Sequence, residues 1–282
     1  MKKIFLIAFS FFISAQLSAQ NYIDFTNHYK SFRLFEKPSI ELNYGSSGIK
    51  LNGTANNLAN AGLIELKLGF TTKRKSYFGK DITGYENRYF FVGNASDKNN
   101  PKSKGNEEIK NDLWRFGFGN KDAYGLKLGS VEIMPYNSNS FAWSKFTYDN
   151  GAMTAEADKN YYNDFNDVFR FGSVTEGGIN LQLTPGFSIQ PQFETAIIFP
   201  RHLFGKQLMS SVIEMSGYYL IDNFTKKIMR NAPAAGTFVN FILKNAYEFG
   251  FYQLRKDKMN WPFNSAAPMR YYTYKLGLAF TF

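Results

Sequence analysis

The sequence predicts an all-β protein, a transmembrane antiparallel β-barrel of about ten strands, within a range of about eight to twelve. Three observations predict it: a strictly alternating C-terminal segment, an apolar N-terminal segment of the kind that directs export, and many aromatic residues without a long apolar helix. Together they indicate a chain that crosses a membrane with strands.

The last twelve residues, 271–282, alternate between two kinds of side chain. Thr273, Lys275, Gly277, Ala279 and Thr281 are polar or small. The other side of the strand carries only aromatic residues and leucine: Tyr272, Tyr274, Leu276, Leu278, Phe280 and Phe282. A period of two with one apolar face is what a strand needs when it faces lipid on one side and a barrel interior on the other.

The first residues, Met1–Lys3, are positively charged, and residues 4–13 form an apolar run that only Ser10 interrupts. Small residues at Ser18 and Ala19 complete the pattern of a cleaved signal peptide over residues 1–19. The run is too short for a spanning helix, which needs about 20 apolar residues; a short buried helix is the alternative. We therefore expect one exported barrel domain over residues 20–282.

Composition limits the function classes. The chain has 30 Phe, 18 Tyr and 3 Trp, yet its mean hydropathy is −0.33. No stretch after the signal is long and apolar enough for a helical membrane protein, whereas a barrel needs aromatic girdles at both interfaces. The absence of cysteine excludes disulfides and thiol catalysis, and we expect no metal and no cofactor. The net charge of +10 favours anionic lipopolysaccharide or solutes over nucleic acid, because export removes the chain from the cytoplasm.

Alternation elsewhere predicts the remaining strands. Asn120–Asp122 and Thr184–Gly186 have turn composition and predict tight hairpins. The polar segment 94–111 is expected as an outer loop, and the same count places 150–166 on the opposite side of the membrane. The expected strands cover residues 40–51, 63–70, 85–93, 112–119, 124–133, 141–148, 168–174, 178–183, 187–199 and 271–282.

Residues 204–252 break this rhythm. Apolar residues recur at intervals of three and four from Phe204 to Tyr219, and again from Phe238 to Phe249. This spacing predicts a helical insert before the last strand, which either plugs the lumen or packs at one rim. The alternative is further strands, because residues 237–243 alternate equally well.

The alternation and the terminal Phe282 resemble the closing strand of Gram-negative outer-membrane β-barrel proteins. This resemblance implies an outer-membrane location, contact with lipid and lipopolysaccharide, and insertion by the barrel-assembly machinery. It also implies that the six aromatic and leucine residues of the last strand form the assembly signal.

Several charged residues fall on the predicted inward faces and would form a lumen charge network. Its predicted members are Lys67, Glu65, Arg88, Arg115, Arg170 and Lys275, with Glu86 and Glu194 as companions. Such charges must be paired when buried. The network either fills a narrow barrel or lines a path for anions.

The two histidines are the candidates for catalysis. Asp24, His28 and Ser31 would meet on one helical turn, and His202 precedes Ser210 and Ser211. Neither spacing matches a lipid-modifying barrel. The sequence therefore favours a non-enzymatic protein, either a narrow pore or a membrane-embedded component of an envelope assembly with a protein partner. An acyl hydrolase or transferase using His28 or His202 is one alternative, and a soluble periplasmic β-sandwich is another.

Overall fold

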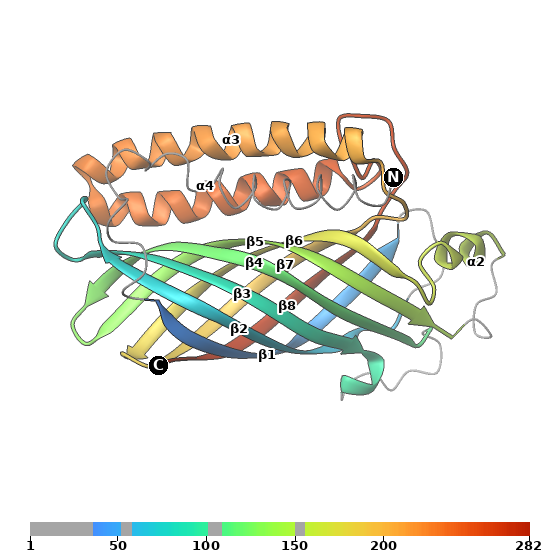
Figure 1. Cartoon of the computed structure of the whole chain (residues 1–282), viewed down its shortest axis with the longest axis horizontal. Coiled ribbons are helices and arrows are strands. Elements are labelled where there is room, and N and C mark those ends of the chain that lie inside the picture. Colours follow the sequence, from blue (N-terminus) through green and yellow to red (C-terminus); the bar gives the residue numbers. More distant parts are fainter. Residues whose placement is uncertain (1–35, 52–57, 101–108, 150–155) are drawn as a thin grey trace. The chain divides into compact units, whose positions relative to one another are not determined.

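The part of the chain that the structure describes forms a closed antiparallel barrel of eight strands (Figure 1). The computed structural model describes residues 36–51, 58–100, 109–149 and 156–282. Each strand pairs with its neighbour in the sequence, and the last pairs with the first, so the sheet has no free edge. The strands are β1 (Lys37–Leu51), β2 (Ala61–Lys75), β3 (Ile82–Ser96), β4 (Asn111–Leu128), β5 (Val131–Tyr148), β6 (Phe169–Thr184), β7 (Phe187–Ile198) and β8 (Met269–Thr281).

The predicted closed barrel is confirmed; the described residues form eight strands, not about ten, at the lower end of the predicted range of eight to twelve, and these strands make one closed sheet and not a two-sheet sandwich. Segments expected as separate strands are continuous. β4 runs straight through Asn120–Asp122, where a turn was predicted, and β6 joins the segments 168–174 and 178–183. The hairpin between β4 and β5 is made instead at Gly129, whose φ of +65° suits glycine.

The two ends of the barrel differ. Short connections, residues 76–81, 129–130 and 185–186, define one end, which we call the short-turn end. Residues 52–60, 97–110, 149–168 and 199–268 connect the strands at the other, the long-loop end. The strand ends that border the segments 94–111 and 150–166 therefore lie at the same end of the barrel, not on opposite sides as predicted. Three strands were predicted between these two segments, but the structure has two, β4 and β5, so the chain returns to the same end.

The outer and inner faces of the wall alternate as a lipid-facing barrel requires. Outward side chains are largely apolar: Tyr274 is 62% exposed and Leu276 53% exposed on β8. At about 3.3 Å per residue and a tilt of about 40°, even the 12-residue β7 rises about 30 Å, more than the ~25 Å apolar band of such barrels.

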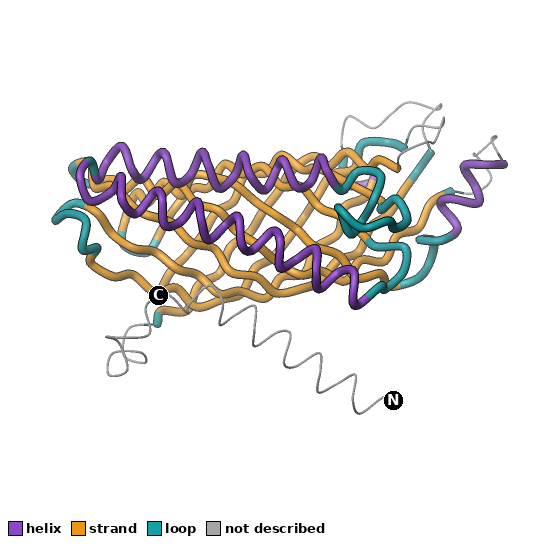
Figure 2. The backbone as a smooth tube through the Cα atoms, turned by 90° about the horizontal axis from the view of Figure 1, so that it is seen from above, coloured by secondary structure: helices purple, strands orange, loops and turns teal. Residues whose placement is uncertain are grey.

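Two long helices, α3 (Phe204–Asn231) and α4 (Pro233–Leu254), occupy the segment for which helical spacing was predicted. They stand between β7 and β8 in the chain and form an antiparallel hairpin, here called the α3–α4 hairpin. The hairpin packs along the outside of the barrel, over β4 to β7, and does not plug the lumen or cap a rim (Figures 1 and 2). Among the described residues, no helix has the length and apolar character needed to cross a membrane.

Side chains fill the lumen in layers. At the long-loop end an apolar cluster includes Leu63, Leu113 and Phe146, and it is capped by Tyr162 of the short helix α2 (Glu156–Asn163) and by Phe165. Charged and polar side chains occupy the middle and the short-turn end. The predicted signal peptide, residues 1–19, and the separate candidate site of Asp24, His28 and Ser31 both lie outside the described residues.

Candidate functional site

Eight buried charged side chains meet in the middle of the lumen. They come from six of the eight strands, because each sits at an inward position of the alternating pattern. Within the described chain we call this set the central network: Glu41, Glu65, Lys67, Arg115, Lys121, Glu176, Glu194 and Lys275. Four are cationic and four anionic, so the network carries no net charge.

Lys275 of β8 joins three carboxylates. Its Nζ lies 2.9 Å from Oε1 of Glu65 and 2.7 Å from Oε2 of Glu176, and it also contacts Glu194. Arg115 donates to Glu65 and Glu194 and, over 2.9 Å, to the Tyr271 hydroxyl. Since an unpaired buried charge is strongly unfavourable, these multiple contacts are what allow charged side chains to be buried in the lumen.

The rest of the central network lies nearer the short-turn end. Lys67 lies 2.7 Å from Glu176, and Lys121 lies 2.9 Å from Glu41. The Tyr136 hydroxyl donates to Glu176 over 2.8 Å. Each cation of the network contacts at least two acceptors. These contacts hold the side chains in position, so they cannot easily move aside to let a solute through the lumen.

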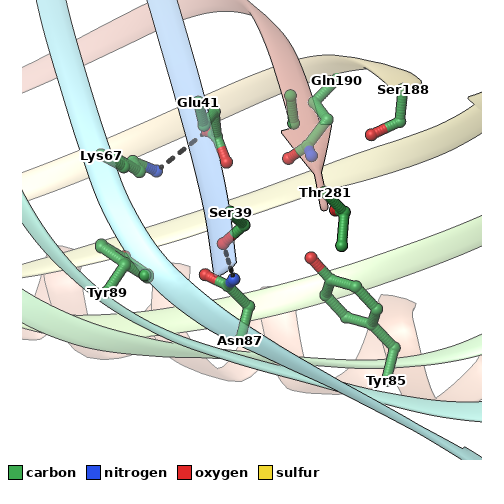
Figure 3. A pocket seen from close by; sticks show the side chains of 11 residues that line it. Ser39, Glu41, Lys67, Tyr85, Asn87, Tyr89, Ser188, Gln190 and Thr281 are labelled. Carbon is green, nitrogen blue, oxygen red and sulfur yellow. Dashed lines mark hydrogen bonds and ion pairs between the residues drawn. The ribbon is translucent and has the colours of Figure 1, made fainter. Parts of the chain in front are cut away.

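A small cavity lies between the central network and the short-turn end (Figure 3). Lys67 and Glu41 lie on one side of it, 3.4 Å apart, and Asn87 donates to Ser39 over 2.7 Å on another. Its volume of about 10 Å³ is room for about one water molecule. The cavity is not a channel.

Three carboxylates of the central network, those of Glu65, Glu176 and Glu194, bring oxygens within 4.8 Å of one another. Such a group has the composition of a divalent cation site. Here, however, Lys275 contacts all three, and Arg115 contacts two of them. The protein's own cations therefore already balance these charges.

The structure brings together four of the predicted lumen residues, Lys67, Glu65, Arg115 and Lys275, with the companion Glu194. The other two do not join them. Arg88 lies on the outer face of β3, where it pairs with Glu86 over 3.0 Å. Arg170 stands at the long-loop rim and donates to the backbone carbonyl of Asp164.

Sequence reasoning missed Glu41, Lys121 and Glu176. Glu41 alternates with Ile40 and Leu42, so the period of two was sufficient to find it. The other two stand in stretches whose composition resembles turns, Asn-Lys-Asp and Thr-Glu-Gly. No local signal distinguishes these stretches from loops.

His202 and Ser210 contact different groups. Its ring packs 5.6 Å from that of Phe171, and burial, then the nearby positive charge of Arg170, lower its pKa. The Ser210 hydroxyl donates to the Trp261 carbonyl over 2.6 Å and accepts from Arg255. Ser210 is therefore engaged away from the imidazole.

A second polar site lies outside the barrel, between the wall and the α3–α4 hairpin. Lys244 of α4 lies 3.0 Å from Asp122 of β4 and 3.1 Å from Asp222 of α3. Tyr218 donates to Asn137 of β5 over 2.9 Å. An ion pair and hydrogen bonds thus hold the hairpin to a polar part of the wall, which we call the covered wall: Asp122, Asn137, Asn139, Thr175 and Gly177.

No protein-family model matches the chain, and no curated protein matches it. Among solved structures the chain is similar to neisserial surface protein A, NspA, with 10% identity and a TM-score of 0.36 over 88% of this chain and 97% of that chain. It is also similar to Ail, the attachment invasion locus protein of Yersinia pestis, with 11% identity and a TM-score of 0.33 over 88% of this chain and 100% of that chain. Similarity at this level of identity and TM-score does not indicate what this chain does.

Proposed function

We propose that the protein is a closed outer-membrane β-barrel that acts as a membrane-embedded component of an envelope assembly, and not as an open pore. The filled lumen carries this conclusion. The central network occupies its middle with paired charges, and the apolar cluster under Tyr162 and Phe165 closes the long-loop end. A barrel without a path through it acts through its surfaces.

Two further observations support the membrane location. The outer face of β8 presents Tyr274, Leu276, Leu278 and Phe280, each at least 40% exposed. The strands are long enough to cross the apolar band of an outer membrane. An apolar surface of this extent is unfavourable in water and is stable against hydrocarbon.

The balance of charge argues against a path for anions. Four carboxylates offset four cations within the central network, so an anion there would meet as much repulsion as attraction. Entry would also require desolvation and the breaking of buried ion pairs. The balanced charge of the central network therefore favours a component of an envelope assembly over a narrow pore.

Conductance in planar lipid bilayers tests this proposal. The purified, folded protein is expected to give no stable single-channel current, whereas an open porin in the same bilayers gives one. A steady current carried by the unmodified protein would contradict the closed lumen. In parallel, mild-detergent extracts of native outer membranes are expected to hold the protein in a species larger than a monomer; a monomer alone would contradict the assembly role.

A further inference from the structure

The α3–α4 hairpin has the opposite polarity from a helical pair of a soluble protein. In α4 the buried residues include Thr237, Asn240, Lys244 and Glu248. The exposed residues from Pro233 to Tyr252 are all apolar: Ala234, Ala235, Phe238, Ile242, Ala246 and Phe249. Polar groups thus face the protein, and apolar groups face outward.

The same inversion holds in α3. Ser210 and Thr225 are buried, and almost every exposed residue between 207 and 225 is aromatic or aliphatic. These exposed residues are Leu208, Met209, Val212, Ile213, Ser216, Tyr219, Leu220 and Phe224. The single small polar residue among them is Ser216. Its hydroxyl donates a hydrogen bond to the Val212 carbonyl over 2.7 Å, so this donor is paired within the helix.

The covered wall explains why polar residues face inward. Elsewhere the outward positions of the strands carry residues such as Leu68 and Phe90, but the covered wall carries Asp122, Asn137 and Asn139. Asp122 pairs with Lys244, and Asn139 donates to Glu248 over 3.3 Å. The hairpin therefore supplies ion-pair and hydrogen-bond partners to polar side chains of the covered wall, which hydrocarbon could not supply.

We propose that the α3–α4 hairpin lies at bilayer depth beside the barrel, with its exposed apolar face in contact with lipid hydrocarbon. This inference rests on the proposed membrane location of the barrel. Its apolar face continues that of the wall: Phe249 of α4 packs 6.4 Å from Phe193 of β7, which packs 4.9 Å from Tyr274 of β8. One aromatic surface thus runs from helix to sheet.

The position of the charges agrees with this depth. Lys206 stands at the start of α3, and Lys226, Lys227 and Arg230 stand at its end. Lys206 and Lys226 lie twenty residues apart, a rise of about 30 Å at 1.5 Å per residue, which matches the ~30 Å hydrocarbon core of a bilayer. Long basic side chains at such positions reach the polar interface on each side.

The charges between these ends are paired within the protein. Glu214 accepts from Arg255 over 2.7 Å, and Asp222 contacts both Lys226 and Lys244. The groups that lower the mean hydropathy of the two helices are thus turned toward each other or toward the covered wall. Lipid would meet only the apolar face of the docked pair.

Site-directed spin labels in lipid vesicles test this inference, and the cysteine-free chain permits single-cysteine variants without background. Leu220→Cys and Ile242→Cys place one label on each helix. Leu278→Cys reports the apolar face of β8, and Tyr77→Cys, at a residue 88% exposed in the β2–β3 turn, reports water. Each variant is checked for folding by the altered gel migration of the unheated protein.

Labels at 220 and 242 are expected to collide with oxygen as often as the label at 278, and with a water-soluble nickel chelate several-fold less often than the label at 77. Nickel access at 220 and 242 that equals access at 77 would overturn the inference, as would protection from both reagents, which indicates a second copy over this face. If the label at 278 also reports water, the proposed membrane location fails. If it reports lipid while 220 and 242 do not, only the inference about the hairpin fails.

Discussion

Replacement of Lys275 by methionine removes the side chain that joins three carboxylates of the central network. Lys275→Met leaves the volume nearly unchanged, but Glu65, Glu176 and Glu194 lose a shared cation whose side chain is 0% exposed. The network then holds four carboxylates against three cations.

The expected destabilisation follows from this loss. Removal of one partner of a buried ion pair costs about 3–5 kcal/mol, and at 1.4 kcal/mol per factor of ten this is roughly a hundred- to a few-thousand-fold in the unfolding equilibrium. The surface pair of Lys145 and Asp167, with side chains 36% and 70% exposed, provides a matched control. Lys145→Met is expected to change stability by less than about 1 kcal/mol.

Denaturant unfolding in lipid vesicles, followed by tryptophan fluorescence, measures both variants. A second substitution, Glu176→Gln, restores neutrality in the Lys275→Met background, so the double variant should be less destabilised than the sum of the two single variants. Equal stability of Lys275→Met and Lys145→Met would refute the view that the lumen is held by mutually paired ions. So would strict additivity in the double variant.

Three other predictions follow from the same geometry. Gly129→Ala forces a non-glycine residue to a φ of +65° in open space, and should lower the free energy of unfolding by about 1 kcal/mol; an unchanged denaturation midpoint would contradict this. Lys244→Met leaves Asp122 without its ion-pair partner on the hairpin and Asp222 with Lys226 alone, so the hairpin should loosen and trypsin should cleave faster at its charged tip, whereas an unaltered digestion pattern would count against the ion pair as the attachment. His202→Ala should leave the outer-membrane lipid profile unchanged by mass spectrometry, and an altered acyl composition would revive the enzymatic alternative.

Local alternation predicted the class of fold and several strands because the barrel repeats one rule along its wall. The terminal strand was visible because its outward residues are all aromatic or leucine. Residues 204–252 were visible as helical because apolar residues recur there at three and four. Each of these signals resides within a dozen or so neighbouring residues.

The overestimated strand count has a specific physical origin. The predicted breaks fell near Asp122, Asn137 and Thr175, which interrupt the apolar face of β4, β5 and β6. These residues belong to the covered wall, where helices distant in sequence replace lipid as the neighbour. Polar residues inside a membrane strand therefore marked a docking site and not a turn.

The misplaced arginines have a different cause. Around Arg88 the sequence carries Tyr89, Phe90 and Phe91, so aromatic residues stand on both faces and the phase of the alternation is ambiguous. Tyr89 and Phe91 point inward and help to fill the lumen, and Arg88 therefore points outward. Arg170 is in the inward phase, but it lies too near the rim to reach the central network.

Quenching of tryptophan by brominated lipid tests the central claim most directly, because the claim is that the apolar outer wall contacts hydrocarbon. In a Trp261→Phe variant the remaining tryptophans, Trp114 and Trp143, are both on the outer face of the wall. Their fluorescence should fall strongly in vesicles of brominated lipid relative to unbrominated vesicles. Unquenched fluorescence, from a chain that stays monodisperse in buffer without detergent, would contradict the account.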